Sequence, residues 1–177
     1  MAQFDLQPHL TGELLEVRPL HPDDWEPLFA VAADPLIWEV HPARERYKEE
    51  YFREYFREGL ESGGALAVID RKTGEIIGAS RYFWYGQNQS ELEIGWTFLS
   101  RAYWGGVYNG ELKALMLRHA FHFVDHVIFL VGVNNIRSQR AMVKIGGVLT
   151  KRRVERTLHS HSSEFVIFEI CKSAATA

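Results

Sequence analysis

Apolar residues recur along the chain at two spacings, one typical of strands and the other of helices. Alternating or continuous apolar runs predict strands at residues 12–20, 65–70, 76–85, 90–100, 126–133, 147–158 and 163–170. Helical spacing predicts helices at residues 21–34, 43–64, 110–124 and 135–146. Several apolar runs are short and lie between turn signals, as expected for strands buried in a sheet.

The order of these elements is β-α-α-β-β-β-α-β-α-β-β. Such an order predicts an α/β (α+β) fold, with a mixed, largely antiparallel central sheet of about seven strands flanked by four helices. The chain of 177 residues has no internal repeat and no low-complexity linker. We therefore expect a single domain over residues 1–177.

Charge and composition exclude several classes of partner. The formal net charge is -3, which gives no electrostatic reason to expect nucleic acid or an anionic membrane as a partner. The basic run "KRRVER" at residues 151–156 is short, and we interpret it as a solvated strand face. The N-terminal sequence lacks the pattern of a signal peptide, and no apolar run could cross a bilayer, so we expect a cytoplasmic protein. The lone Cys171 is expected to be a small core residue.

A glycine loop precedes the third predicted helix. The stretch "YWGGVYNGELK" (residues 103–113) places Gly105 and Gly106 between a predicted strand and the start of that helix. A helix N-terminus offers unpaired N–H groups and partial positive charge, and glycine lets a phosphate approach the backbone. The alternative is a tight strand-to-helix turn with no ligand. The sequences typical of nucleoside triphosphate and dinucleotide loops are absent.

A second motif lies one predicted strand further on. Asn135 and Ser138 form N-x-x-S, and Lys144 and Gly146 form K-x-G. From "LEIGWTFLSRAYWGGVYN" through "VNNIRSQRAMVKIGG" the sequence resembles the GNAT acetyltransferases, and most closely their ribosomal-protein N-terminal acetyltransferase branch. The order of elements also matches that family, so the resemblance extends over nearly the whole chain.

The resemblance implies that acetyl-CoA is the cosubstrate and that the chain transfers an acetyl group to a primary amine by direct attack on the thioester. The strand at 90–100 would splay from the strand at 126–133, and the pantetheine arm would lie between them beside Phe98 and Leu99. The remaining residues implied to bind the cosubstrate are Trp104, Gly105, Gly106, Val107, Tyr108, Asn109, Gly110, Asn135 and Ser138.

Three positions depart from the family pattern. Val107 replaces the central loop glycine, Asn109 replaces a small residue, and Met142 stands where many relatives carry a tyrosine general acid. Val107 keeps its N–H but restricts the backbone to negative φ, so we expect Gly106 or Gly110 to absorb the strain. These departures keep open an alternative function, a non-catalytic acyl-CoA-binding or regulatory protein.

Direct acetyl transfer needs a base, an oxyanion donor and a proton for the leaving thiolate. Glu91 and Glu93 point to the same face of one predicted strand, and we favour Glu93 as the base because it is closer to the splay. The alternative is a pair of solvent-facing carboxylates. A backbone N–H near residues 96–98 is the expected oxyanion donor. Ser138 is the candidate proton donor, or else a polar residue near the helix start that Asn135 caps.

Other catalytic classes lack support in the sequence. No G-x-S-x-G motif occurs. His119, His122 and His126 share a helical spacing but lack the usual zinc pattern, so we expect no metal site. His159 and His161 are expected at the surface of the last hairpin turn.

The acceptor is not identified by the sequence. A protein or peptide N-terminus, an amino acid, a polyamine and an aminoglycoside-like amine all remain open. A strongly cationic acceptor would require an acidic cleft. The aromatic side chains that could line an acceptor cleft are Trp38, Tyr82, Trp84 and Trp96, whereas those of the second helix, Tyr47, Tyr51, Phe52, Tyr55 and Phe56, are expected mainly in the core. Many relatives form dimers, so a homodimer also remains open.

Overall fold

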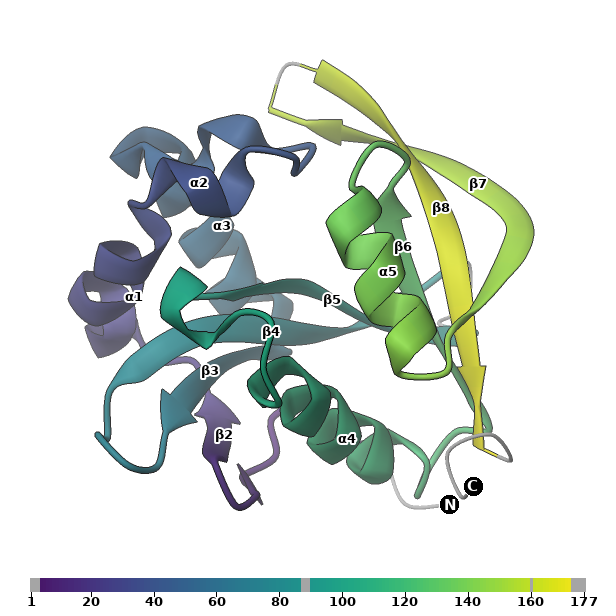
Figure 1. Ribbon diagram of the computed structural model, residues 1–177, viewed down its shortest axis with the longest axis horizontal. Helices are drawn as coiled ribbons and strands as arrows, with labels where there is room; N and C mark the ends of the chain where they lie inside the picture. The colour runs from purple at the N-terminus through teal and green to yellow at the C-terminus, as the bar shows by residue number, and fades with distance from the viewer. Residues whose placement is uncertain (1–3, 87–89, 160, 173–177) are drawn as a thin grey trace.

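The computed structural model describes residues 4–86, 90–159 and 161–172, and its described strands form one eight-stranded sheet of order β1-β2-β3-β4-β5-β6-β8-β7 (Figure 1). The strands are β1 (Leu10–Thr11), β2 (Leu15–Pro19), β3 (Ala65–Asp70), β4 (Ile76–Tyr85), β5 (Glu91–Leu99), β6 (His126–Gly132), β7 (Val148–Leu158) and β8 (His161–Cys171). The α-helices are α1 (Trp25–Ala32), α2 (Pro35–Trp38), α3 (Glu49–Ser62), α4 (Tyr108–Ala120) and α5 (Ile136–Lys144). Short 3-10 helices are η1 (Pro22–Asp24), η2 (Arg44–Tyr47) and η3 (Arg101–Tyr103).

Every described pair of neighbouring strands is antiparallel except β5 and β6. The parallel pair requires a crossover, and α4 supplies it between the two strands. The predicted mixed and largely antiparallel sheet is therefore confirmed. The sheet has eight strands rather than about seven because the two-residue β1 pairs with β2.

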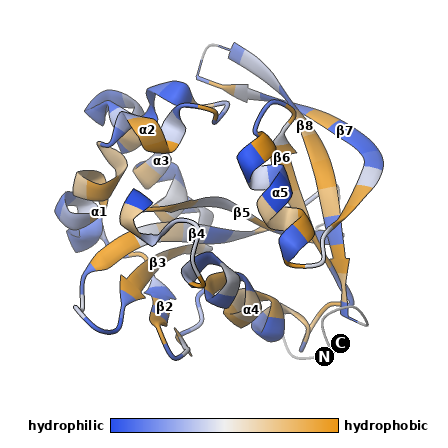
Figure 2. Ribbon diagram, viewed as in Figure 1, coloured by the Kyte–Doolittle hydropathy of each residue, from blue (hydrophilic) through white to orange (hydrophobic). Residues whose placement is uncertain are grey.

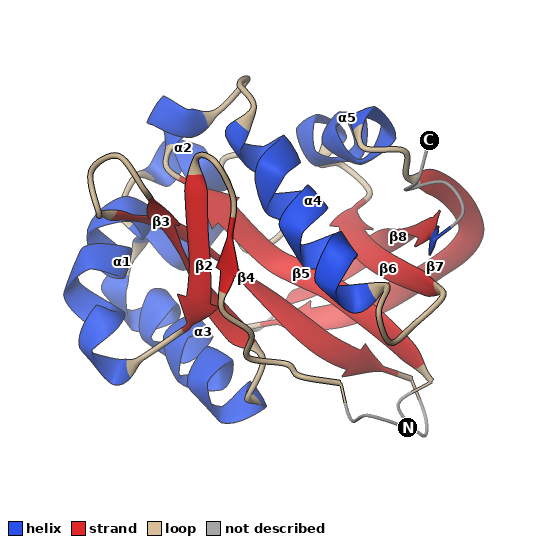
Figure 3. Cartoon of the chain, turned by 90° about the horizontal axis from the view of Figure 1, so that it is seen from below, coloured by secondary structure: helices blue, strands red, loops and turns tan. Residues whose placement is uncertain are grey.

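The two faces of the sheet are buried by different helices. Along β3, Leu66 and Val68 belong to one core cluster with α4, while Ala65 and Ala67 belong to another with α1, α2 and α3. This alternation follows from the two-residue period of a strand. Figure 3 shows α4 and α5 on one side of the strands and α3 on the other. Figure 2 shows the apolar colour on β6 and β8, and polar colour on much of β7.

Two predicted helices are broken in the structure. The segment at residues 43–64 divides at Lys48, whose φ of -84° and ψ of 138° are extended, so η2 and α3 are separate. The segment at residues 21–34 contains η1 and α1, and a further helix, α2, begins at Pro35 with Asp34 as its N-cap. The segment between α1 and α3 contributes Ile37, Trp38 and His41 to the cleft between β5 and β6.

The expected core position of Cys171 is wrong. Cys171 is exposed, since it is the last residue of β8 and pairs with His126 at the first position of β6. None of the described helices is long and apolar enough to cross a membrane.

Candidate functional site

The two central strands separate after a short contact. Pairing of β5 with β6 is limited to Leu92 with Val127 and Glu93 with Ile128, although β5 continues to Leu99. Figure 1 shows the two ribbons diverging beyond this contact. The expected splay is therefore present, and it opens the interior of the sheet to a ligand.

The separation coincides with an irregularity in β5. Its register against β4 shifts between Ala79 and Arg81, and Trp96 adopts a φ of 52°, in the left-handed region. A bulky residue pays a strain cost there, of about 1–2 kcal/mol. The hydroxyl of Tyr55 donates a hydrogen bond of 2.7 Å to the Trp96 carbonyl oxygen and so holds this conformation in place. A tryptophan at positive φ is not predictable from the sequence, because tertiary contacts maintain it.

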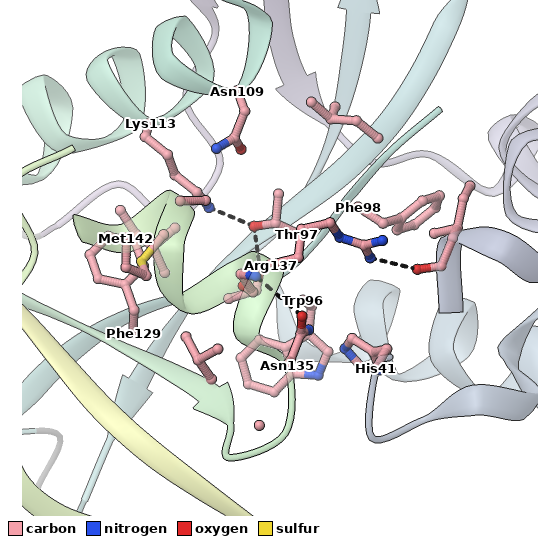
Figure 4. A pocket seen from close by; sticks show the side chains of 18 of the residues that line it. His41, Trp96, Thr97, Phe98, Asn109, Lys113, Phe129, Asn135, Arg137 and Met142 are labelled. Atoms are coloured by element: carbon pink, nitrogen blue, oxygen red, sulfur yellow. Dashed lines mark hydrogen bonds between the residues drawn. The ribbon is translucent and has the colours of Figure 1, made fainter. Parts of the chain in front are cut away.

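A cleft of about 240 Å³ occupies the splay. Residues of α2, β5, α4, β6 and α5 line it, together with His41 after α2 and residues of the glycine loop. The described lining residues include the side chains of His41, Lys113 and Arg137 but no aspartate or glutamate. Figure 4 shows several of these side chains converging on the space between the strands.

The glycine loop stands at one end of this cleft. Trp104 donates its indole N–H to the Leu99 carbonyl oxygen at 2.9 Å, and the guanidinium of Arg137 lies 3.9 Å from the centroid of its ring. The loop is thereby fixed to the end of β5 and to α5. Gly105 has a φ of 69°, which favours glycine, and a Cβ added at Gly105 or Gly106 would meet no heavy atom within 4 Å. The backbone before α4 is therefore open to a ligand.

Val107 takes an ordinary helical conformation. Its φ is -85°, it is the N-cap residue of α4, and its side chain is largely exposed. The expectation that Gly106 or Gly110 absorbs the strain is wrong, because Gly105 carries the positive φ. Val107 at negative φ thus fits the loop without distortion.

The residues implied to bind a cosubstrate separate into two groups. Those that line the cleft are Phe98, Leu99, Trp104, Gly105, Asn109, Asn135 and Ser138. Those outside its described lining are Gly106, Val107, Tyr108 and Gly110, which form the exposed turn and the first turn of α4. The ring of Tyr108 packs edge-on against Tyr103, 4.8 Å between centroids.

The second motif forms the two ends of α5. The side chain of Asn135 accepts a hydrogen bond from the Ser138 backbone N–H at 3.2 Å, as predicted for an N-cap. Lys144 is the last residue of α5, and Gly146 follows with a φ of 88°. The K-x-G half of the motif therefore ends the helix, whereas Ser138 and the buried Met142 face the cleft.

The two candidate carboxylates have different environments. Glu93 is 1% exposed and accepts hydrogen bonds from both terminal nitrogens of Arg156, at 3.1 and 2.6 Å. Glu91 makes the equivalent pair with Arg152 at 2.7 Å but remains partly exposed. Burial raises the pKa of Glu93, although the hydrogen bonds and charge of Arg156 oppose the shift. The interpretation of both carboxylates as solvent-facing is therefore wrong for Glu93, and "KRRVER" supplies both ion-pair partners, the half-buried Arg156 and the exposed Arg152.

Lys113 is a residue of the cleft that the sequence analysis missed. It is 3% exposed, and its ammonium donates to the Thr97 hydroxyl at 2.7 Å (Figure 4). The Thr97 hydroxyl in turn lies 2.8 Å from the Ser80 hydroxyl. Burial lowers the pKa of Lys113 to about 7. The signal was available, because Lys113 precedes the buried Met116 and Leu117 by three and four positions and so lies on the apolar face of the helix.

The aromatic residues considered for an acceptor cleft divide clearly. Trp38 and Trp96 line the cleft. Tyr82 does not line it, since its hydroxyl donates to the Met116 carbonyl oxygen at 2.7 Å in the core under α4, and Trp84 packs against the same cluster. From the second predicted helix, the buried residues are Phe52, Tyr55 and Phe56, as expected for a core face.

The histidines form no metal site among the described residues, in which no group of three or more potential ligands occurs. His119 and His122 bond backbone carbonyl oxygens at 2.8 and 2.7 Å. The expected surface position is correct for His161 but wrong for His159, which packs 4.5 Å from Tyr51 and bonds Glu54 at 2.6 Å. The last hairpin thus contacts α3 through His159.

Comparison with known proteins gives a consistent result. The model of the acetyltransferase (GNAT) domain matches residues 15–148. No curated protein sequence matches the chain significantly. Among solved structures, similarity is found to a GCN5-related N-acetyltransferase from Brucella melitensis, with 16% identity, 95% of this chain and 80% of that chain covered, and a TM-score of 0.76.

Two further solved structures have the same fold. A GNAT-family acetyltransferase from Bacillus anthracis is 18% identical, with 94% and 99% of the two chains covered and a TM-score of 0.73. A ribosomal-protein-S5-alanine acetyltransferase from Vibrio fischeri is 14% identical, with 93% and 96% covered and a TM-score of 0.63. At these identities the structural likeness establishes the fold alone.

Proposed function

Because the chain belongs to the GNAT acetyltransferase family, we propose that it is an acetyl-CoA-dependent N-acetyltransferase that acylates a primary amine by direct attack on the thioester. The observation that carries this proposal is the position of the glycine loop at one end of the cleft between β5 and β6. The backbone N–H groups of a loop without covering side chains, at the N-terminus of a thirteen-residue helix, can bind a pyrophosphate. A groove between two diverging strands suits an extended pantetheine arm, which can pair with strand backbone.

The donor chemistry of the cleft fits acetyl-CoA. Gly105 and Gly106 leave the space before α4 free of side chains, and Asn109 and Ser138 present polar groups to the cleft from two different helices. Lys113 and Arg137 add positive charge without a carboxylate in the described lining. An anionic cosubstrate would therefore enter a site of opposite, positive charge.

Glu93 is the proposed base. The acceptor nitrogen would form a bond to the thioester carbonyl carbon and give its proton to Glu93, directly or through water, as the carbon–sulfur bond breaks. Burial favours the protonated form of this carboxylate and so raises its affinity for a proton. Arg156 would hold the carboxylate in position and share its charge before the transfer.

The leaving thiolate requires a proton, and two groups are candidates. Ser138 faces the cleft from the first turn of α5, and the Lys113 ammonium lies opposite it at Thr97. Met142 is apolar and offers no acidic hydrogen from the same helix. Backbone N–H groups at the irregular segment Trp96–Phe98 remain the proposed donors to the oxyanion.

One observation favours the alternative function, an acyl-CoA-binding protein without turnover. Both oxygens of Glu93 are engaged by Arg156, so this carboxylate has to share or exchange a partner before it accepts a proton. Binding and turnover must therefore be measured separately.

We expect amine-dependent release of free CoA thiol from acetyl-CoA, with the acetylated product seen by mass spectrometry. The panel comprises amino acids, peptides with free N-termini, a polyamine and an aminoglycoside, each compared with a reaction lacking amine. Release well above the amine-free rate for one class establishes the transferase. Saturable acetyl-CoA binding without release for any amine would instead support the binding protein.

A further inference from the structure

Two arginines beside the Tyr55 ring are buried and form no ion pair with a described carboxylate. Arg46 on η2 is 6% exposed and Arg81 on β4 is 4% exposed. Among the described residues neither forms an ion pair within 4.0 Å. The Nε atom of each is fully buried and has no hydrogen-bond partner there.

Aromatic rings hold these two guanidinium groups. Arg46 lies 4.8 Å from the Tyr55 ring centroid and 5.6 Å from that of Trp38. Arg81 lies 5.6 Å from Tyr55 and 4.6 Å from Trp96, and it donates one hydrogen bond of 3.3 Å to the Tyr55 carbonyl oxygen. Since Trp38 and Trp96 line the cleft, both arginines stand directly behind its wall.

This arrangement is unfavourable unless an anion joins it. A buried charge is usually paired, and removing it from water costs several kcal/mol, on the order of the whole stability of some domains. Two other buried charges are paired, Asp24 with Arg18 and Glu93 with Arg156, whereas the Lys113 ammonium is held by the Thr97 hydroxyl. Burial lowers the pKa of Arg46 to about 10.

The nearby acids do not compensate for the two arginines. Glu54 and Glu58 of α3 lie near enough to act on Arg46 through their charge, and Glu58 and Glu93 act on Arg81 in the same way. None of them forms an ion pair with either arginine, since Glu54 is bonded to His159 and Glu93 to Arg156. The second ring nitrogen of His159, Nε2, is likewise buried without a partner in the described structure. Within the described residues, two unsatisfied donors, the Nε atoms of Arg46 and Arg81, therefore lie beside Tyr55.

We propose that Arg46 and Arg81 bind an anionic oxyacid group, a carboxylate or a phosphate, carried by the acceptor amine. This inference rests on the proposed acetyltransferase function and names its substrate class. Guanidinium groups recognise planar or tetrahedral oxyanions through paired N–H donors, and cation–π contacts hold them in place. Polyamines and aminoglycosides are disfavoured, since the described cleft lining carries Lys113 and Arg137 and no acid, while burial lowers the pKa of His41 and leaves its ring neutral (Figure 4).

The position of the arginines relative to the proposed base indicates how the acceptor would lie in the site. Arg81 and Arg156 both lie over the Trp96 ring, at 4.6 and 5.0 Å from its centroid, and Arg156 holds Glu93. The anionic group would therefore lie beside Tyr55, and the amine of the same molecule would reach the thioester past Trp96, next to Glu93. Arg46 and Arg81 would accordingly select the acceptor and take no part in proton transfer.

The test uses matched analogues of the acetylated product that differ only in the anionic group. Calorimetry in saturating CoA compares N-acetyl amino acids with their amides, and N-acetyl phosphoethanolamine with N-acetyl ethanolamine. We expect at least one anionic ligand to bind at least tenfold more tightly than its neutral counterpart. The first pair reports a carboxylate and the second a phosphate. Equal affinity within every pair, in a protein that does bind acetyl-CoA, would overturn the inference and leave the proposed function standing.

The variants Arg46→Met and Arg81→Met provide the second arm. Each should reduce the anionic preference at least fivefold while acetyl-CoA affinity stays within twofold of the parent. Arg57→Met is the matched control, because Arg57 is exposed on α3 and paired with Glu61. Both buried variants should remain folded, with a thermal midpoint at or above that of the parent, since an unpaired buried charge is removed. Loss of acetyl-CoA affinity, or loss of fold in both variants, would assign the arginines to the cosubstrate or to structure and overturn the proposal.

Discussion

Replacing Glu93 with glutamine is expected to lower kcat about 100- to 1,000-fold, the usual contribution of a general base. The amide keeps the size of the side chain but cannot accept the acceptor's proton at neutral pH. Acetyl-CoA affinity should change less than twofold, because Glu93 is absent from the described lining of the cleft. Steady-state kinetics and calorimetry on the same preparation separate the two effects.

Glu91→Gln is the matched control for this variant. Glu91 lies on the same face of β5 and pairs with an arginine of β7 in the same manner, yet it lies two residues further from the splay. Its kcat should remain within about threefold of the parent value. An equal loss in both variants would show that the β5–β7 ion pairs act on structure, and unchanged turnover in Glu93→Gln would remove Glu93 from the mechanism.

Replacing Lys113 with methionine is expected to change the pH dependence of stability. The folded pKa of Lys113 is about 7, below the unfolded value near 10.5, so the unfolded chain binds more protons between these two pH values. Stability of the parent therefore rises with pH through this window and falls as pH drops towards 7. Between pH 6 and pH 9, the parent should gain about 2.5 kcal/mol relative to Lys113→Met.

Urea unfolding at several pH values measures this difference. Lys113→Met should be the more stable protein at pH 6, with the advantage shrinking towards pH 9. Arg118→Met provides a control, because Arg118 is an exposed cation on the same helix and should shift stability equally at every pH. A constant offset between parent and Lys113→Met across the range would mean that the buried ammonium stays charged and that its burial carries no such cost.

The parts of the site that the sequence revealed are those with a local signature. Two helix N-termini are predicted from residue type alone. One follows Gly105 and Gly106, and the other lies at Asn135, three residues before Ser138. The structure begins α4 at Tyr108, two residues before the predicted range, and α5 at Ile136, one residue after the predicted start at Asn135. The alternation of β5 likewise placed Glu91 and Glu93 on one face, as their ion pairs to β7 show.

The parts that were missed depend on contacts between distant segments. Arg46 and Arg81 are charged residues that a periodicity analysis assigns to solvent, and only the packing of η2 and β4 around Tyr55 buries them. Trp96 adopts a positive φ because Tyr55 and Arg81 hold it there. The break at Lys48 follows a run with unbroken helical spacing, so no local pattern indicates it. Each of these features lies on the side that we propose for the acceptor, so the local patterns of the sequence left the acceptor open.

The central claim, that the glycine loop binds the pyrophosphate of acetyl-CoA, is tested most directly by titrating acetyl-CoA into the parent, Gly106→Asn and Gly106→Asp proteins. Gly106 is the best position, because its φ lies outside the left-handed region and an added Cβ meets no atom within 4 Å. The two variants have the same size and differ by one negative charge. We expect clear binding by the parent and at least tenfold weaker binding by Gly106→Asp than by Gly106→Asn. Equal affinity of the two variants, or no binding by the parent, would contradict the central claim.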